Sequence, residues 1–147
     1  MKPFLFFILT ALGAVPGFAD EIVRVKATGD VTQTMNALEA AVTGAGATVF
    51  ARVDHAGGAA SVDMELPPSE LLVFGNPKLG TPAMIDDPLA GLFLPLKVLV
   101  YEDADGVWLA YEAPAEMLDD LNISDDATYL SVMAGALDKL TAKAAGG

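Results

Sequence analysis

The chain has 147 residues, a formal charge of −12, 53% hydrophobic residues and no cysteine. This length and apolar content predict one domain with a packed core. The lack of cysteine excludes thiol catalysis, zinc–thiolate sites, iron–sulfur clusters and covalent c-type haem. The acidic charge makes nucleic acid and anionic membrane surfaces poor partners, because it repels their phosphates.

The amino terminus predicts a secretory signal peptide over residues 1–19, which leaves residues 20–147 as a single α+β domain. Lys2 supplies the basic start, residues 4–15 are apolar, and residues 17–19 fit a small-residue cleavage site. The apolar run is shorter than the roughly 20 residues of a membrane-spanning helix, although retention as an anchor is the alternative. We therefore expect export across the inner membrane, a periplasmic location and no stable membrane span after cleavage.

The first half of the mature chain predicts two strands with a helix between them. Alternating β-branched residues favour a strand over residues 21–26. Asp30 then resembles a helix N-cap with Gln33 at the capping-box position. The helix is expected to end at Gly44, and its apolar stripe consists of Val31, Met35, Leu38 and Val42. A second strand follows over residues 47–53, and the Gly- and Ala-rich stretch after it predicts a loop or a short distorted helix.

The middle of the chain predicts a fully buried strand over residues 70–74, followed by a tight turn. We expect left-handed backbone angles in Gly75-Asn76-Pro77, since Gly and Asn tolerate them and Pro disfavours helix at the preceding residue. A short helical turn is expected to begin at Thr81-Pro82.

Residues 94–103 and 107–112 predict a hairpin. With Gly106 left-handed, Asp103 is expected to pair with Val107. This register places Leu99, Tyr101, Leu109 and Tyr111 on one face, and Leu96, Val98, Val100 and Trp108 on the other. Both faces are apolar, so we expect helices on one face and a ligand, a second subunit or the short helices near Thr81 on the other.

The last part of the chain predicts a short helix over residues 114–121 and a long helix that begins near Ser124 or Asp125. The apolar stripe of the long helix consists of Leu130, Met133, Leu137 and Leu140. The order β-α-β-β-β-β-α predicts an α+β two-layer sandwich with a mainly antiparallel sheet and two long helices on one face.

His55 is the one histidine of the chain and the single candidate for a metal or cofactor contact. One His is too few for a closed zinc site unless carboxylates such as Asp54 or Asp63 join it. It is enough to serve as an axial ligand of non-covalent haem, and two copies of His55 could meet across one macrocycle in a two-fold dimer. A structural role at a strand end is the alternative. Because no Gly-x-Ser-x-Gly elbow is present, we expect no catalytic triad.

One pattern covers most of the mature chain. It consists of Val53-Asp54-His55-Ala56, Phe74-Gly75-Asn76-Pro77-Lys78-x-Gly80-Thr81-Pro82-x-Met84, Pro88, Leu94-Pro95-Leu96-Lys97-Val98-Leu99-Val100-Tyr101-Glu102-Asp103, Asp105-Gly106, Trp108 and Tyr111. This pattern resembles the core of the domain-of-unknown-function family 302. The resemblance implies a small α+β domain with an antiparallel sheet that pairs as a homodimer. The stretch after His55 departs from the alanine-rich helix of that family through Gly57-Gly58 and Pro67-Pro68.

These observations predict an exported homodimer that binds haem or another small planar or apolar ligand through His55. Further pocket or interface candidates are Phe74, Asn76, Tyr101, Trp108 and Tyr111. One alternative is an enzyme in which Glu102 acts with Tyr101 or Tyr111 as acid and base. Another is a structural dimer with no ligand.

Overall fold

The computed structural model describes residues 22–146, and the predicted signal peptide lies outside this range. The elements are β1 (Ile22–Lys26), α1 (Val31–Gly44), β2 (Thr48–Asp54), α2 (His55–Ala60), β3 (Ser69–Gly75), α3 (Pro77–Asp86), the 3-10 helix η1 (Pro88–Leu92), β4 (Leu96–Asp103), β5 (Gly106–Glu112), α4 (Pro114–Met117) and α5 (Thr128–Ala144).

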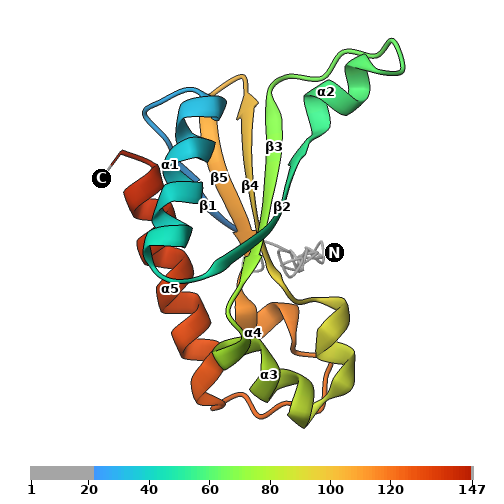
Figure 1. The fold of residues 1–147 in the computed structure, drawn as a ribbon, viewed down its shortest axis with the longest axis vertical. Helices are drawn as coiled ribbons and strands as arrows, with labels where there is room; N and C mark the ends of the chain where they lie inside the picture. Colours follow the sequence, from blue (N-terminus) through green and yellow to red (C-terminus); the bar gives the residue numbers. More distant parts are fainter. Residues whose placement is uncertain (1–21, 147) are drawn as a thin grey trace, which may run out of the picture.

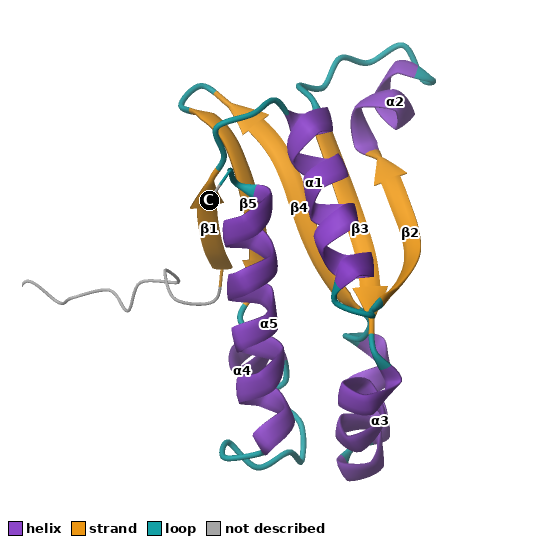
Figure 2. Ribbon diagram, turned by 60° about the vertical axis from the view of Figure 1, so that its left-hand side comes forward, coloured by secondary structure: helices purple, strands orange, loops and turns teal. Residues whose placement is uncertain are grey.

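The strands form one five-stranded sheet in the order β1-β5-β4-β3-β2, and every neighbouring pair is antiparallel. Figures 1 and 2 show α1 and α5 side by side on one face of this sheet. The predicted α+β sandwich, with its antiparallel sheet and two long helices on one face, is therefore confirmed. Among the described residues, none of the helices has both the length and the apolar character needed to cross a bilayer.

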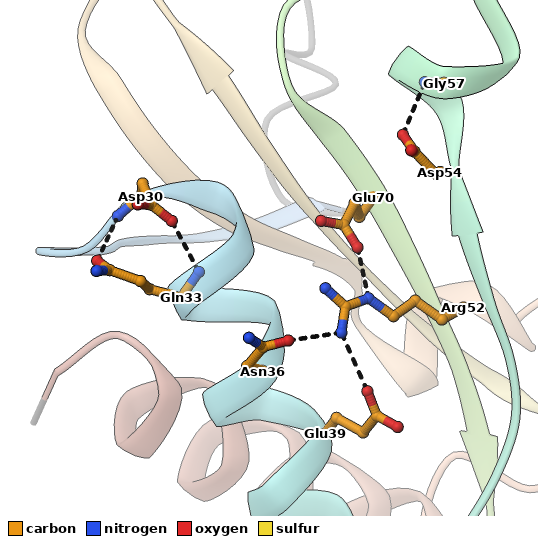
Figure 3. Close-up of polar contacts among 8 residues, drawn as sticks. All are labelled: Asp30, Gln33, Asn36, Glu39, Arg52, Asp54, Gly57 and Glu70. Atoms are coloured by element: carbon orange, nitrogen blue, oxygen red, sulfur yellow. Dashed lines mark hydrogen bonds and ion pairs between the residues drawn. The ribbon is translucent and has the colours of Figure 1, made fainter.

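Local sequence signals explain the two long helices. The Gln33 amide donates to Oδ1 of Asp30 at 2.8 Å, and the Asp30 amide donates back to Gln33 Oε1 at 3.3 Å (Figure 3), which makes the predicted capping box. Both predicted apolar stripes are buried between the helices and the sheet. The long helix α5 begins at Thr128, later than predicted, because the Ala127 amide donates to the Ser124 carbonyl in a preceding turn.

A polar network fastens α1 to the edge of the sheet. Arg52 of β2 donates to Asn36 Oδ1 at 2.7 Å and to Glu39 Oε2 at 3.2 Å, and its Nε bonds Glu70 of β3 (Figure 3). The hydrogen bond with Glu70 is the main cause that raises the pKa of Arg52. The guanidinium therefore stays charged while it joins three elements.

The predicted hairpin register is wrong by one residue. Asp103 pairs with Gly106, so that Val100 lies opposite Leu109 and Tyr101 lies opposite Trp108. Asp103 Oδ1 accepts from the Asp105 amide at 2.9 Å and from Trp108 Nε1 at 3.0 Å. These bonds stabilise the turn between β4 and β5, which is one residue shorter than the predicted turn. A one-residue slip exchanges the faces of a strand. The helix-covered face therefore holds Leu96, Val98, Val100, Leu109 and Tyr111, whereas Leu99, Tyr101 and Trp108 face the other way.

The predicted left-handed turn at Gly75-Asn76-Pro77 is also wrong. Asn76 is extended, with φ of −134°, and accepts the Lys78 amide at 3.0 Å as the N-cap of α3. The helix thus begins at Pro77 and continues through Pro82. The preceding strand is not fully buried, since in β3 only Leu72 and Phe74 are. The helix predicted over residues 114–121 ends at Met117.

An irregularity interrupts edge strand β2. Val49 pairs with Phe74 and Ala51 pairs with Val73, so Phe50 is the extra residue of a β-bulge. Its side chain is 59% exposed. The bulge directs Phe50 away from the core and toward the segment that follows β3, as described below.

Candidate functional site

An apolar pocket of about 310 Å³ lies at the end of the sheet where β2 and β4 begin and β3 ends. We call it the foot pocket. It is lined by Phe50, Gly75, Asn76, Pro77, Leu79, Gly80, Thr81, Met84, Leu94, Pro95, Leu96 and Met133. Most of these residues belong to the two segments around Gly75 and Leu94 that carry the sequence pattern. The residues of this sequence pattern therefore line the foot pocket as well as shaping the fold.

Small residues allow the walls of the foot pocket to approach one another. A Cβ atom at Gly75 would lie 3.3 Å from Pro95 Cβ and 3.6 Å from Phe50 Cε2. At Gly80 it would meet Leu94 Cδ1 at 3.7 Å, which is an ordinary contact. Alanine would therefore press on its neighbours at the first position but would fit at the second.

A hydrogen bond between α5 and α3 supports the same wall. The Tyr129 hydroxyl of α5 donates to Asp86 Oδ2 of α3 at 2.7 Å. Burial, together with this bond and the charge of Asp86, raises the pKa of Tyr129 to about 12. The phenol therefore stays protonated at neutral pH and holds α3 against the helix that supplies Met133.

The lining of the foot pocket suits apolar contacts. Among its described lining residues none is ionisable, and Asn76 and Thr81 alone carry polar side chains. The side-chain Oδ1 of Asn76 already accepts the Lys78 amide in the N-cap of α3. A ligand would gain mainly from burial of apolar surface, at roughly 25 cal/mol per Å². Pockets of this size and character bind small molecules in many proteins.

His55 lies elsewhere, at the first position of α2, and its side chain is exposed. Asp54 caps α2 by accepting the Gly57 amide at 2.8 Å (Figure 3), so this carboxylate is engaged by the backbone. A hollow beside α2 is lined by Ala56, Ala60, Met64, Glu65, Leu66 and Pro67. Within residues 22–146, no three His, Asp or Glu side chains come together in a way that could hold a metal ion.

The other predicted site residues fall into three places. Asn76 lines the foot pocket, while Phe74 is buried in the core. Tyr101 and Trp108 pair on the sheet face that lacks the long helices. There the Arg24 guanidinium lies 4.4 Å from the Trp108 ring centroid and 5.5 Å from that of Tyr101. These residues therefore do not converge with His55 on one site.

Asp103 completes this cluster on the open face. Its Oδ2 accepts from Arg24 at 2.8 Å. Partial desolvation acts to raise the pKa of Asp103, but hydrogen bonds from Asp105, Trp108 and Arg24 outweigh it and hold the pKa below its usual range. The carboxylate thus stays ionised and fixes both Arg24 and the indole.

Neither tyrosine of the enzyme alternative shares a site with Glu102. Tyr101 precedes Glu102 directly in β4, so the two side chains point to opposite faces of the sheet. Glu102 pairs with Val107 next to the hairpin turn, whereas Tyr111 lies at the other end of β5. The Tyr111 hydroxyl donates to Asp138 Oδ1 at 2.6 Å. Burial and this bond raise the pKa of Tyr111, so its phenol is a poor base at neutral pH.

The sequence prediction missed most residues of the foot pocket. Phe50 lines the pocket because a β-bulge turns it away from the core, and Met84 does so because α3 begins earlier than predicted. Met133 lines the pocket because α5 packs against α3. The density of Gly and Pro around residues 75–82 and 94–95 was the available signal, because such residues mark close backbone approaches.

Fold and pocket together define a small α+β sandwich domain with an apolar cavity at one end of its sheet. The chain belongs to the family described as Domain of unknown function DUF302, which it matches over residues 23–144. A crystal structure of an uncharacterized conserved DUF302 protein from Bacillus stearothermophilus has the same fold. It shares 19% sequence identity, with a TM-score of 0.70, over 87% of this chain and 98% of that one.

Curated relatives carry the name of a channel. The chain is 38% identical over 117 residues to Fluoride-specific ion channel FluC 1 of Brucella suis biovar 1 (strain 1330), which covers 78% of this chain and 46% of that protein. FluC 1 of Brucella abortus biovar 1 (strain 9-941) gives the same identity over 43% of its length. The chain therefore spans less than half the length of these relatives.

Proposed function

We propose that this chain is an exported, homodimeric domain that binds a small apolar or planar ligand. The foot pocket is the observation that carries this proposal, because its lining is apolar and its volume, about 310 Å³, suits a small molecule. The ligand is uncharged at the part that enters, since no ionisable side chain among the described lining residues would pair with a charge.

A fluorescent probe tests the foot pocket. N-phenyl-1-naphthylamine is neutral and apolar, and its emission rises when it leaves water. We expect enhancement with the wild-type chain and a loss of at least about tenfold in affinity for Gly80→Met, whose side chain would fill the cavity beside Leu94 and Met84. Gly135→Met is the matched control, since a Cβ there meets nothing within 4 Å. Equal binding by both variants would place the ligand elsewhere.

A haem version of the proposal uses His55. His55 is exposed and directly precedes Ala56, which lines the hollow beside α2 together with Ala60, and the small side chains of these two alanines support the approach of a flat ligand. Two such sites would meet across one haem if the dimer axis passes near α2. Titration with haem should shift and sharpen the Soret band of free haem; His55→Ala should abolish this shift, and Gly80→Met should leave it unchanged. An identical spectrum for wild type and His55→Ala removes this version and leaves the foot pocket as the site.

Export is supported by the amino-terminal pattern of Lys2, the apolar run and the residues before Asp20. The test is to express the complete sequence in a bacterium with a periplasm and to determine the amino terminus of the protein recovered there. We expect a chain that begins at Asp20. A chain that keeps Met1 and stays with the membrane fraction would replace export with anchoring.

The names of the Brucella relatives favour a second candidate, a domain that works beside a membrane ion channel. Direct fluoride binding by this chain is disfavoured, because a formal charge of −12 repels anions. In this candidate the domain contacts a channel instead of taking up the ion. Crosslinking in cells that contain this chain, followed by mass spectrometry of the membrane fraction, should then recover a channel protein. Recovery of only copies of this chain would remove the candidate.

A further inference from the structure

The sheet face opposite α1 and α5 carries a largely apolar row with basic side chains at its β1 end. Strand pairing places Arg24, Ala110, Leu99, Leu71 and Val53 in one row across the sheet. The next row contains Lys26, Trp108, Tyr101 and Ser69. We call these two rows the open face. No long helix covers the open face in the part of the chain that the structure describes (Figures 1 and 2).

The charge of the open face differs from that of the whole chain. Arg24 and Lys26 stand at its β1 side, and the Lys26 ammonium lies 5.3 Å from the Trp108 ring centroid. Asp103 pairs with Arg24, so Lys26 remains as net positive charge in a chain whose formal charge is −12. An acidic, partly apolar surface would complement this face.

Residues 55–68 form such a surface, which we call the arm. In Figures 1 and 2, α2 continues from the end of β2 beyond the edge of the sheet, away from α1 and α5, and the chain returns from it to β3 through a loop. Val62 is 63% exposed and Met64 is 66% exposed. Asp63 and Glu65 alternate with them, and the arm contains no Lys or Arg. The arm therefore presents apolar side chains and negative charge together.

We propose that the arm of one copy docks on the open face of a second copy, reciprocally across a two-fold axis. The apolar side chains of the arm cover the row formed by Leu99 and Leu71, and Glu65 lies within the field of Lys26. This complementarity points to a second copy as the occupant, because the chain itself supplies an acidic and partly apolar surface. The inference rests on the homodimer of the proposed function and specifies its surfaces.

Truncation on the arm is the first test, with protein produced from the complete sequence. Met64→Ser should raise the dimer dissociation constant about tenfold or more in sedimentation equilibrium, because an apolar side chain no longer becomes buried on association. Leu92→Ser is the matched control, since Leu92 is 78% exposed but lies on η1. It should leave the dissociation constant unchanged.

Charge reversal is the sharper test. Lys26→Glu and Glu65→Lys should each weaken self-association, because both contacts of each homodimer then join like charges. Mixing the two variants should restore association, since the mixed dimer has one reversed pair and one wild-type pair, both attractive. Lys139→Glu, on α5, makes the same change of charge away from the open face and should have no effect.

The outcomes distinguish failure of the homodimer itself from failure of the contact between the arm and the open face. A wild-type chain that stays monomeric at all concentrations overturns the homodimer and this inference with it. A dimer that resists Met64→Ser, or variants whose mixture associates no better than either alone, overturns only the arm and open-face contact. A dimer that Leu92→Ser disrupts uses the surface of η1 and also overturns it. Circular dichroism of each variant confirms that the fold is retained.

Discussion

Replacement of Tyr111 by Phe removes a single hydroxyl from a side chain that is 5% exposed. The hydroxyl donates to Asp138 Oδ1 at 2.6 Å and so joins β5 to α5. Loss of one such bond lowers the free energy of unfolding by about 1–2 kcal/mol near neutral pH, because the acceptor is charged but can regain water.

The same bond makes this difference depend on pH. Burial and Asp138 raise the pKa of Tyr111 in the folded chain, whereas a tyrosine of the unfolded chain ionises near about pH 10. Below that pH both states keep the proton and the contribution is complete. Above it the unfolded chain loses its proton first, and the contribution falls by about 1.4 kcal/mol per pH unit. The stability advantage of wild type over Tyr111→Phe should therefore vanish near about pH 11.

Urea unfolding at pH 8, 9, 10 and 11, followed through Trp108 fluorescence, measures this difference. Subtraction of the variant from the wild type cancels the ionisation of the other side chains, which both chains share. Asp138→Asn is the companion variant, since it keeps an acceptor but removes the charge that helps to raise the pKa of Tyr111. An advantage that stays constant from pH 8 to pH 11 would refute the interpretation of this hydrogen bond.

Three further changes test the scaffold by thermal or urea unfolding. Arg52→Met should cost about 1–2 kcal/mol, because it leaves Glu70 without its guanidinium partner, and an unchanged midpoint would show that the network adds nothing to stability. Asp30→Ala should cost about 1 kcal/mol through loss of the capping box, whereas Asp30→Asn should retain most of the stability. Gly106→Ala should cost about 1–3 kcal/mol, since φ there is +129°; a neutral result would mean that the hairpin turn rearranges at no cost.

Signals confined to one stretch of sequence were sufficient for α1 and for the buried side of α5, although not for the residue at which α5 begins. Asp30 and Gln33 mark the start of α1, and the spacing of its apolar residues marks the buried side, because both depend on contacts within one or two turns. The fold class followed from the order of such elements.

Features that depend on contacts between elements were not accessible in the same way. The hairpin register depends on which partners the Asp103 carboxylate takes, and Trp108 and Asp105 together favour the shorter connection. Asn76 has the residue type for either a left-handed turn or an extended N-cap, and the structure has the latter. The walls of the foot pocket depend on the conformation of Asn76 and on the packing of α3 on α5, so the pocket could not be predicted from local signals.

The β-bulge at Phe50 has a consequence for how copies of the chain can meet. A straight edge strand offers a ladder of free amides and carbonyls on which another strand can grow. The extra residue in β2 interrupts that ladder and twists the strand locally. Continuation of the sheet into a neighbouring molecule, which is the first step toward a fibre, is thereby disfavoured at this edge. A residue that shapes a cavity on one side of the strand thus also makes the β2 edge a poor template for a further strand.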